Sequence, residues 1–183
     1  GPGDLVIGAD SHTCTYGGVA ALGTGMGSAD IGACLALGET WFKVPETIRV
    51  EYNGKLPAHM GGKDLVLWLI GQIGVDGARY MSLEFVGDTI DALSIEGRLT
   101  MANMAIEAGG KCGLFAADET TLAYANARNA GDFTPRYPDQ EAKYERVVEM
   151  DAGALESTLA LPHLPGNAKP AKQRKNLEND QGF

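Results

Sequence analysis

Residues 5–13 read Leu5-Val6-Ile7-Gly8-Ala9-Asp10-Ser11-His12-Thr13. The apolar run at residues 5–7 is typical of a buried strand, and a carboxylate, a hydroxyl and an imidazole follow it on consecutive residues. In α/β proteins, polar side chains that carry chemistry gather where strands end. The stretch therefore predicts an α/β fold with a candidate site at the carboxyl end of this first strand.

A second segment with candidate functional residues is Asn103-Met104-Ala105-Ile106-Glu107. It lies within a helix that we expect over residues 98–108. Residues four apart lie on one helix face, so Asn103 and Glu107 are neighbours. If that face is buried, the Glu107 carboxylate needs a partner, and a histidine would serve. A glutamate that faces solvent near a helix end is an equally good interpretation.

The polar stretch Asp10-Ser11-His12-Thr13 also has two interpretations. Asp, Ser and Thr routinely cap helices and form turns. If the stretch is functional, His12 is an acid/base group oriented by a distant carboxylate, and Ser11 is a substrate contact or a base. We expect the chain here to be extended, so that consecutive side chains point to alternate faces and cannot form a local catalytic triad.

Composition excludes several classes of protein. The 183 residues include 24 acidic and 15 basic ones, and a net charge of -9 disfavours nucleic acid and anionic membranes as partners. The sequence has no apolar run long enough to span a bilayer and no signal peptide at its start, which predicts a cytoplasmic protein. The three cysteines, Cys14, Cys34 and Cys112, are widely spaced and predict reduced thiols rather than disulfides or a local zinc site.

Periodicity predicts further strands and helices. Residues 47–52 alternate apolar and charged side chains, which is typical of a half-buried strand. We expect later strands at 80–86, 112–116 and 144–150, and helices from Lys63 and over 118–128. Residues 161–167 have the composition of a proline-rich linker, and we expect the basic run 169–175 to be a solvated segment. Both ends of the chain resemble internal positions of a longer polypeptide.

The glycine run at residues 23–28 approximates a dinucleotide-binding loop, but Ser28 stands where the third glycine is required. A turn into a helix that begins near Ser28 accounts for the run without a cofactor. The many small residues between Ala9 and Gly38 permit close backbone approach. We therefore expect this segment to pack tightly against a larger element.

Several motifs, in this order along the chain, together resemble the aconitase superfamily. They are Gly8-Ala9-Asp10-Ser11-His12-Thr13-Cys14-Thr15, Trp41-Phe42-Lys43-Val44-Pro45-Glu46-Thr47-Ile48, Gly62-Lys63-Asp64, Gly74-Val75-Asp76-Gly77-Ala78, Arg98-Leu99-Thr100-Met101-Ala102-Asn103-Met104-Ala105-Ile106-Glu107-Ala108-Gly109 and Asp118-Glu119-Thr120-Thr121. The resemblance implies an aconitase-like three-layer α/β/α architecture. It divides the chain into the C-terminal part of domain 1 (1–45), domain 2 (46–130), and an irregular linker with the start of domain 3 (131–183).

Within the superfamily, the chain resembles most the branch of the 3-isopropylmalate dehydratase large subunits, in the prokaryotic type related to homoaconitase. This implies a hydro-lyase that isomerises 2-isopropylmalate and 3-isopropylmalate by dehydration and rehydration in leucine biosynthesis. Alternatives are the large subunit of a homoaconitase or of a dimethylmalate-type dehydratase. A further alternative is not an enzyme. The chain could be a non-catalytic folding or interaction module that self-associates through its Gly- and Ala-rich surface.

The resemblance also implies roles for individual residues. In the family, a [4Fe-4S] cluster binds the substrate while protein groups remove and return a proton. Ser11 matches the base or substrate-binding serine, and His12 and Glu107 match an imidazole–carboxylate pair beside the cluster. Asp10 matches a carboxylate that pairs with a histidine outside this chain, and Asn103 matches an amide near the cluster.

The chain departs from the family in its cysteines. The family holds the cluster with a Gly-Ser-Cys-Thr-Asn cysteine and a later Cys-x-x-Cys pair, and the sequence contains neither motif. We therefore expect no metal ligand and no bound cluster in this chain. Its expected partners are the rest of the large subunit, a small subunit and a small hydroxy-acid substrate, and the chain alone is expected to be inactive.

Overall fold

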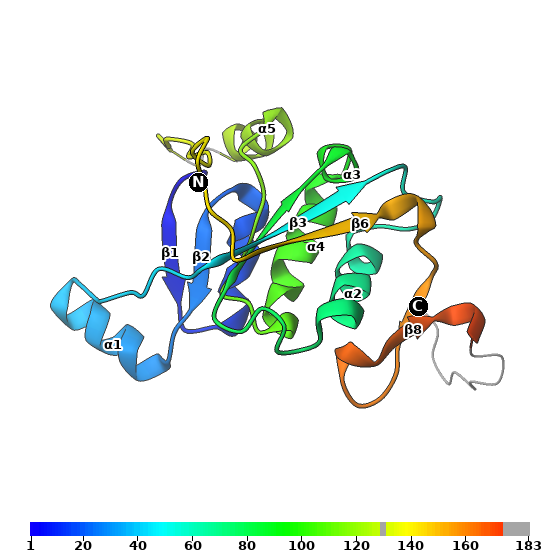
Figure 1. Cartoon of the computed structure of the whole chain (residues 1–183). Helices are drawn as coiled ribbons and strands as arrows, with labels where there is room; N and C mark the ends of the chain where they lie inside the picture. The colour runs from blue at the N-terminus through cyan, green and yellow to red at the C-terminus, as the bar shows by residue number, and fades with distance from the viewer. Residues whose placement is uncertain (129–130, 174–183) are drawn as a thin grey trace.

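A computed structural model of the protein describes residues 1–128 and 131–173. From β1 to β6, helices alternate with parallel strands, which confirms the predicted α/β class (Figure 1). Residues 129–130 lie outside the description. Residues 174–183 also lie outside it. They include the last two positions of the basic run 169–175 and the end of the segment 131–183, which was predicted to hold a linker and the start of domain 3.

The predicted strands lie close to their expected positions, and there are three additional ones. β2 overlaps the start of the glycine run, and β7 and β8 flank the predicted proline-rich linker. The strands are β1 (Leu5–Gly8), β2 (Leu22–Gly25), β3 (Thr47–Asn53), β4 (Ser82–Val86), β5 (Cys112–Leu114), β6 (Arg146–Asp151), β7 (Thr158–Ala160) and β8 (Ala168–Pro170).

The helices predicted from Ser28, from Lys63 and over 118–128 are confirmed, whereas α3 was not predicted. The helix expected over 98–108 begins earlier, at Ile95, is α-helical only as far as Asn103, and then narrows to a 3₁₀ turn. The α-helices are α1 (Ser28–Leu37), α2 (Gly62–Ile73), α3 (Asp88–Asp91), α4 (Ile95–Asn103) and α5 (Glu119–Ala127). The 3₁₀ helices are η1 (Ser11–Val19), η2 (Met104–Ala108), η3 (Ala152–Ala154), η4 (Pro165–Asn167) and η5 (Ala171–Gln173).

A four-stranded parallel sheet in the order β5-β4-β3-β6 forms the centre of the fold. The alternation predicted for β3 is confirmed, because Ile48, Val50 and Tyr52 are fully buried in the core that the sheet shares with α2 and α4. The Tyr52 hydroxyl donates a hydrogen bond of 3.0 Å to the carbonyl oxygen of Leu65 in α2. This contact attaches the helix to the central strand.

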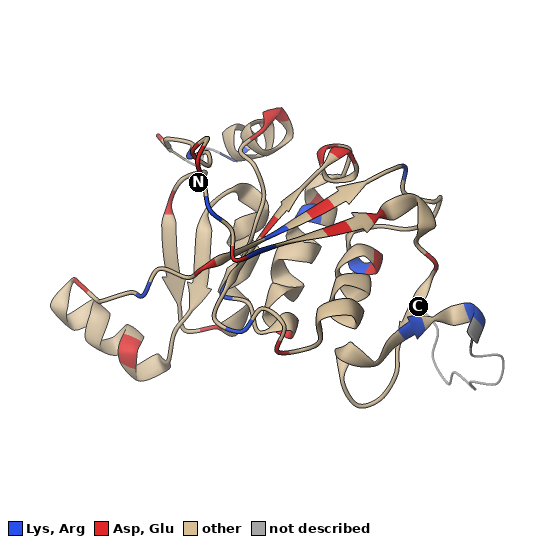
Figure 2. Ribbon diagram, viewed as in Figure 1, with Lys and Arg blue, Asp and Glu red and all other residues tan. Residues whose placement is uncertain are grey.

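The opposite face of the sheet is polar. Arg49 on β3 lies 3.7 Å from Glu51 and 3.9 Å from Glu84 on β4, measured from guanidinium nitrogen to carboxylate oxygen. The Tyr144 hydroxyl also donates to Glu84, and the Arg49 guanidinium carbon lies 5.6 Å from the centre of the Tyr144 ring. Figure 2 shows charged residues along β3, β4 and also β6. The alternation of β3 therefore separates an apolar core from a network of charges.

β1 and β2 form a separate parallel pair, with Leu5 opposite Leu22 and Gly8 opposite Gly25. η1 packs so closely against β2 that a Cβ atom on Gly23 would lie 2.3 Å from the carbonyl oxygen of Thr13. The expectation that small residues permit close backbone approach is confirmed here. The glycine run thus serves packing, and α1 begins after it at Ser28 as predicted.

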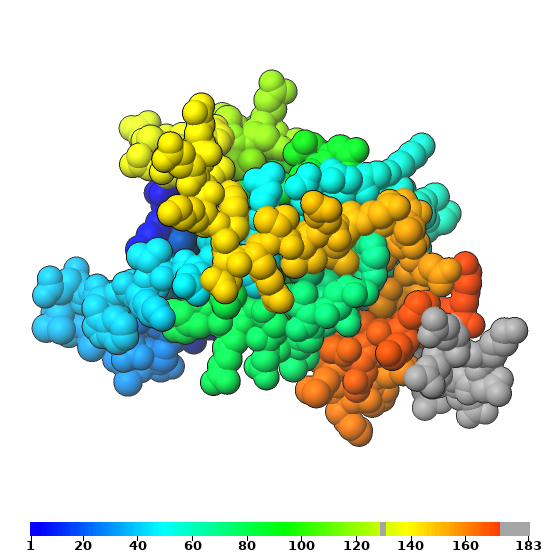
Figure 3. All heavy atoms as spheres, in the orientation of Figure 1, coloured from blue at the N-terminus to red at the C-terminus, as the bar shows by residue number. Residues whose placement is uncertain are grey.

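α1 projects from the rest of the described chain (Figures 1 and 3). None of its residues is buried. Leu35 is 81% exposed, Leu37 73% and the nearby Trp41 82%. Large apolar side chains at such exposure are typical of a surface that contacts another protein segment.

Arg98 on α4 joins three elements of the core. Its side chain is 1% exposed and lies 2.7 Å from the carboxylate of Asp118, which precedes α5. It also donates to the carbonyl oxygens of Ile90 and Asp91, at the end of α3. Partial burial raises the pKa of Asp118, but hydrogen bonds from Arg98 and from the Thr121 amide outweigh it and hold this pKa below its ordinary value.

The proline-rich segment 161–167 contains no strand, but it is the loop of a hairpin that the sequence analysis did not predict. β7 and β8 pair in antiparallel register on either side of this segment, and both strands contact α2. The Cβ of Ala168 would lie 3.2 Å from a Cβ on Gly71, so the hairpin lies directly on that helix. Among the described residues, no helix is long and apolar enough to cross a bilayer.

Candidate active site

The site is built where β1 ends. Asp10 caps η1, because its Oδ1 accepts a hydrogen bond of 2.7 Å from the amide of His12. The Thr13 hydroxyl donates to the Asp10 carbonyl oxygen over 2.7 Å. These bonds turn the chain into a 3₁₀ helix, so the prediction of an extended segment with alternating side chains is wrong.

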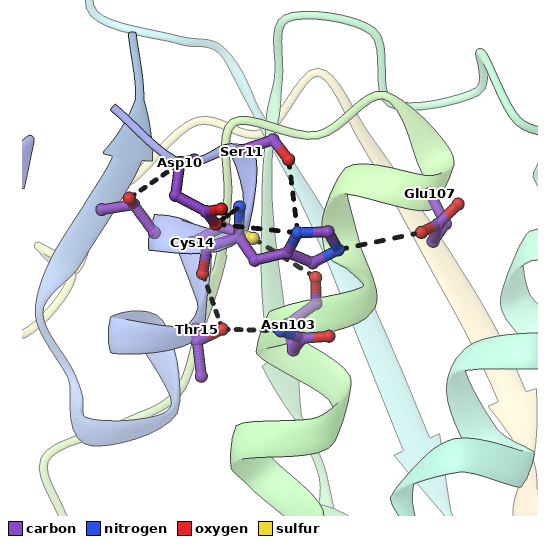
Figure 4. A network of polar contacts seen from close by, with 8 residues as sticks. Asp10, Ser11, Cys14, Thr15, Asn103 and Glu107 are labelled. Carbon is purple, nitrogen blue, oxygen red and sulfur yellow. Dashed lines mark hydrogen bonds and ion pairs between the residues drawn. The ribbon is translucent and has the colours of Figure 1, made fainter. Parts of the chain in front are cut away.

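Because of this turn, the side chains of Asp10, Ser11 and His12 lie together (Figure 4). The Nδ1 atom of His12 is 3.2 Å from the Ser11 hydroxyl oxygen and 3.7 Å from the Asp10 carboxylate. These contacts contradict the prediction that the three side chains point to alternate faces. The imidazole is 45% exposed, so it can reach both its neighbours and a ligand.

The other side of the imidazole faces Glu107 on η2. His12 Nε2 and Glu107 Oε1 lie 4.0 Å apart, which is close enough for an ion pair but too long for a hydrogen bond. Glu107 is 40% exposed, so it both faces solvent and has the histidine partner that the sequence suggested. An imidazole between a hydroxyl and a carboxylate can hold a proton and pass it on.

Asn103, at the end of α4, is held by η1. The side-chain Nδ2 atom of Asn103 donates a hydrogen bond of 2.9 Å to the hydroxyl oxygen of Thr15. The main-chain carbonyl oxygen of Asn103 accepts one of 3.3 Å from the Cys14 thiol. The structure thus brings together all the predicted site residues: Asp10, Ser11, His12, Asn103 and Glu107. The sequence analysis did not single out Thr15, although its spacing of three residues from His12 fits a helical turn.

A pocket of about 460 Å³ lies beside Ser11, within the size range of small-molecule sites. Lys43 and Lys111 line it, and their ammonium groups lie 5.4 and 4.7 Å from the centre of the Tyr80 ring. Asp30 also lines the pocket. Two cations beside a hydroxyl favour an anionic ligand such as a carboxylate. These lysines could not be predicted as neighbours from the sequence, because only the fold brings them together.

Comparison with known proteins identifies the family. The aconitase family (aconitate hydratase) matches residues 1–182. The chain belongs to the aconitase family. It is 58% identical over 181 residues to the 3-isopropylmalate dehydratase large subunit of Oleidesulfovibrio alaskensis. It is 61% identical to that of Desulfovibrio desulfuricans and 59% to that of Nitratidesulfovibrio vulgaris. Each match covers 99% of this chain and 43% of the relative, so the chain spans less than half the length of these relatives.

Aconitase family enzymes carry a [4Fe-4S] cluster, and the cysteines of this chain do not fit one. Burial raises the pKa of the Cys14 thiol to about 11 and that of Cys112 to about 12, whereas a cluster is bound by thiolates. Cys34 lies apart from them on α1. Across residues 1–128 and 131–173, no three His, Cys, Asp or Glu side chains converge on a point where a metal ion could bind.

Burial also predicts how the thiols react. At pH 8, iodoacetamide is expected to label Cys34 and to spare Cys14 and Cys112, because both of these are buried and their pKa values lie well above the pH of the reaction. Peptide mass spectrometry of the labelled chain measures this. In urea, all three cysteines should react at similar rates. Labelling of Cys14 as fast as Cys34 under native conditions would contradict the packing described here.

Proposed function

We propose that this chain is a segment of the large subunit of a hydro-lyase that interconverts 2-isopropylmalate and 3-isopropylmalate in leucine biosynthesis. The observation that carries the proposal is the position of His12, between the Ser11 hydroxyl and the Glu107 carboxylate. Relatives that carry the name 3-isopropylmalate dehydratase large subunit match nearly the whole chain.

The chemistry of dehydration explains why these residue types are needed. A proton leaves one carbon, a hydroxyl leaves the next, and a carbon–carbon double bond forms between them. The first step requires a base, and the second requires an acid that protonates the departing oxygen to give water. Ser11 is the candidate base or substrate contact, and His12 with Glu107 is the candidate acid. Rehydration uses the same groups in reverse.

The remaining predicted residues have supporting roles in this proposal. Asp10 holds η1 in place through its bond to the His12 amide, and it would pair with a histidine elsewhere in the complete polypeptide. Asn103 would offer its amide to the reacting groups or to the cluster. Lys43 and Lys111 would attract a carboxylate of the hydroxy acid to the pocket beside Ser11. The cluster itself requires cysteines from outside this chain.

The proposal includes partners and domain limits. We infer that the chain acts with the rest of the large subunit and with a small subunit, and that it is inactive alone. The exposed apolar side chains of α1 support a contact with further polypeptide. The proposed domains are residues 1–45, 46–130 and 131–183. The separation of the β1–β2 pair from the main sheet supports the limit near residue 45. β6 pairs with β3, so the sheet of the second domain also includes a strand from the third segment.

The test is a turnover assay of the complete large subunit with its small subunit, after anaerobic reconstitution with iron and sulfide. Ultraviolet absorbance of the unsaturated diacid should show activity with 3-isopropylmalate. The isolated chain, treated identically, should bind no cluster and show no turnover. A preference for homoaconitate or for 2,3-dimethylmalate would contradict the proposed substrate. A stable cluster on the isolated chain would contradict the need for outside cysteines.

A further inference from the structure

We propose that Thr15 is a positioning residue, which orients the Asn103 carboxamide so that its oxygen, and not its NH₂ group, is presented to the site. This inference rests on the proposed function for its kinetic consequence, but not for its geometry. Thr15 lies on η1 and Asn103 at the end of α4, 88 residues apart in the chain. A single hydrogen bond of 2.9 Å joins their side chains (Figure 4).

The direction of that bond follows from the number of protons available. A threonine hydroxyl has one proton to donate, and Thr15 lies 2.7 Å from the carbonyl oxygen of His12, to which it donates. Towards Asn103, the Thr15 oxygen can therefore only accept. The atom of Asn103 that faces it must be the donor Nδ2. The Thr15 hydroxyl thus determines the orientation of the Asn103 carboxamide.

The consequence lies on the other side of the amide. A carboxamide is planar, so an NH₂ group that faces Thr15 directs the Oδ1 atom away from it. In the part of the chain that the structure describes, the bond to Thr15 is the one hydrogen bond of the Asn103 side chain. Oδ1 is therefore left as a free acceptor for a donor such as a substrate hydroxyl or a water molecule.

The same hydroxyl connects Asn103 with His12. Thr15 donates to the backbone of the residue whose imidazole faces Glu107, and the Cys14 thiol donates to the Asn103 carbonyl oxygen over 3.3 Å. Both the main chain and the side chain of Asn103 are thus fixed to η1. Without the Thr15 hydroxyl, the amide loses the hydrogen bond that selects this orientation, and it can present its NH₂ group, a donor, in place of an acceptor.

Substitutions in the complete enzyme test the kinetic consequence. Thr15→Val keeps the shape but removes the hydroxyl, and it should lower kcat about tenfold with little change in KM, because one orienting hydrogen bond is lost. Thr15→Ser keeps the hydroxyl and should stay within about twofold of the parent. Thr100→Val is the matched control and should leave kcat unchanged. The Thr100 hydroxyl also donates to a backbone carbonyl oxygen, that of Glu96, over 2.9 Å, but it forms no hydrogen bond with the Asn103 side chain.

A double-mutant cycle separates positioning from a general structural effect. If Thr15 acts through Asn103, then Thr15→Val should cause no further loss in an Asn103→Ala enzyme. Equal losses in the two backgrounds would overturn the proposal. So would an unaltered kcat in Thr15→Val.

A measurement on the 183-residue chain itself remains decisive if the enzyme assay fails. In ¹⁵N-labelled protein, the Asn103 side-chain NH₂ signals should be shifted and slow to exchange in the parent and in Thr15→Ser. In Thr15→Val, they should move towards the positions of solvent-exposed amides. Signals that are the same in all of these proteins would overturn the geometry. Inactivity with isopropylmalate alongside the expected NMR change would instead contradict only the proposed function.

Discussion

Replacement of His12 by alanine is expected to lower turnover of the complete enzyme by about 100-fold or more, which is the usual contribution of a positioned acid/base group. The imidazole contacts the Ser11 hydroxyl at 3.2 Å and faces Glu107 at 4.0 Å. Steady-state kcat with 3-isopropylmalate measures the effect. The loss should appear mainly in kcat, because the proton is transferred after the substrate binds.

A second histidine provides the control. His59 is exposed and forms none of the hydrogen bonds or ion pairs that join the site residues in the described chain. Its backbone has a left-handed φ of 68°. His59→Asn suits that conformation, because asparagine tolerates it better than alanine does, and should leave kcat unchanged. Turnover of His12→Ala within a few-fold of the parent would exclude the acid/base role. Glu107→Gln should also reduce kcat, and its effect should be smaller in the His12→Ala background if the two residues act as a pair.

The second large effect concerns stability. Arg98→Met is expected to lower the free energy of unfolding by about 3 kcal/mol, because it leaves the partners of a buried cation unpaired. Arg98 is 1% exposed and donates to Asp118 and to the carbonyl oxygens of Ile90 and Asp91. Methionine fills most of the space of the arginine stem, so the loss reports mainly on the charge and its hydrogen bonds. Urea unfolding measures it.

Lys172→Met is the matched control for this substitution. Lys172 also pairs with a carboxylate, that of Glu156 at 3.1 Å, but its side chain is 80% exposed. Exposed ion pairs contribute little, so the control should lose less than about 0.5 kcal/mol. Equal losses for the two variants would contradict the structural role of Arg98.

The ion pair also predicts a dependence on pH. Because the pKa of Asp118 is lowered in the folded protein, its contribution to stability is complete above the ordinary aspartate range and is lost as the pH falls through the lowered pKa. The parent should therefore lose stability below a pH of about 4. Arg98→Met lacks the cation that lowers this pKa, so its stability should fall less steeply over the same range.

Much of the fold could be predicted from local pattern. The alternation of residues 47–52 predicted β3, and the apolar run before Asp10 predicted β1. β2 was missed because its residues, Leu22–Gly25, are half glycine, and a strand of this composition has no side-chain pattern. The β7–β8 hairpin was missed because prolines beside it resemble a linker, whereas contacts with α2 hold it in place.

The sequence by itself determined the family, the α/β class and the candidate site residues, because these depend on motifs and short-range periodicity. The candidate residues are Asp10, Ser11, His12, Asn103 and Glu107. Tertiary structure alone decided that η1 turns His12 towards both Ser11 and Glu107. It also decided that Thr15 meets Asn103 and that Lys43 and Lys111 share a pocket. The physical reason is that hydrogen bonds and charges act over a few ångströms in space, and these residues reach that range only when distant segments pack together.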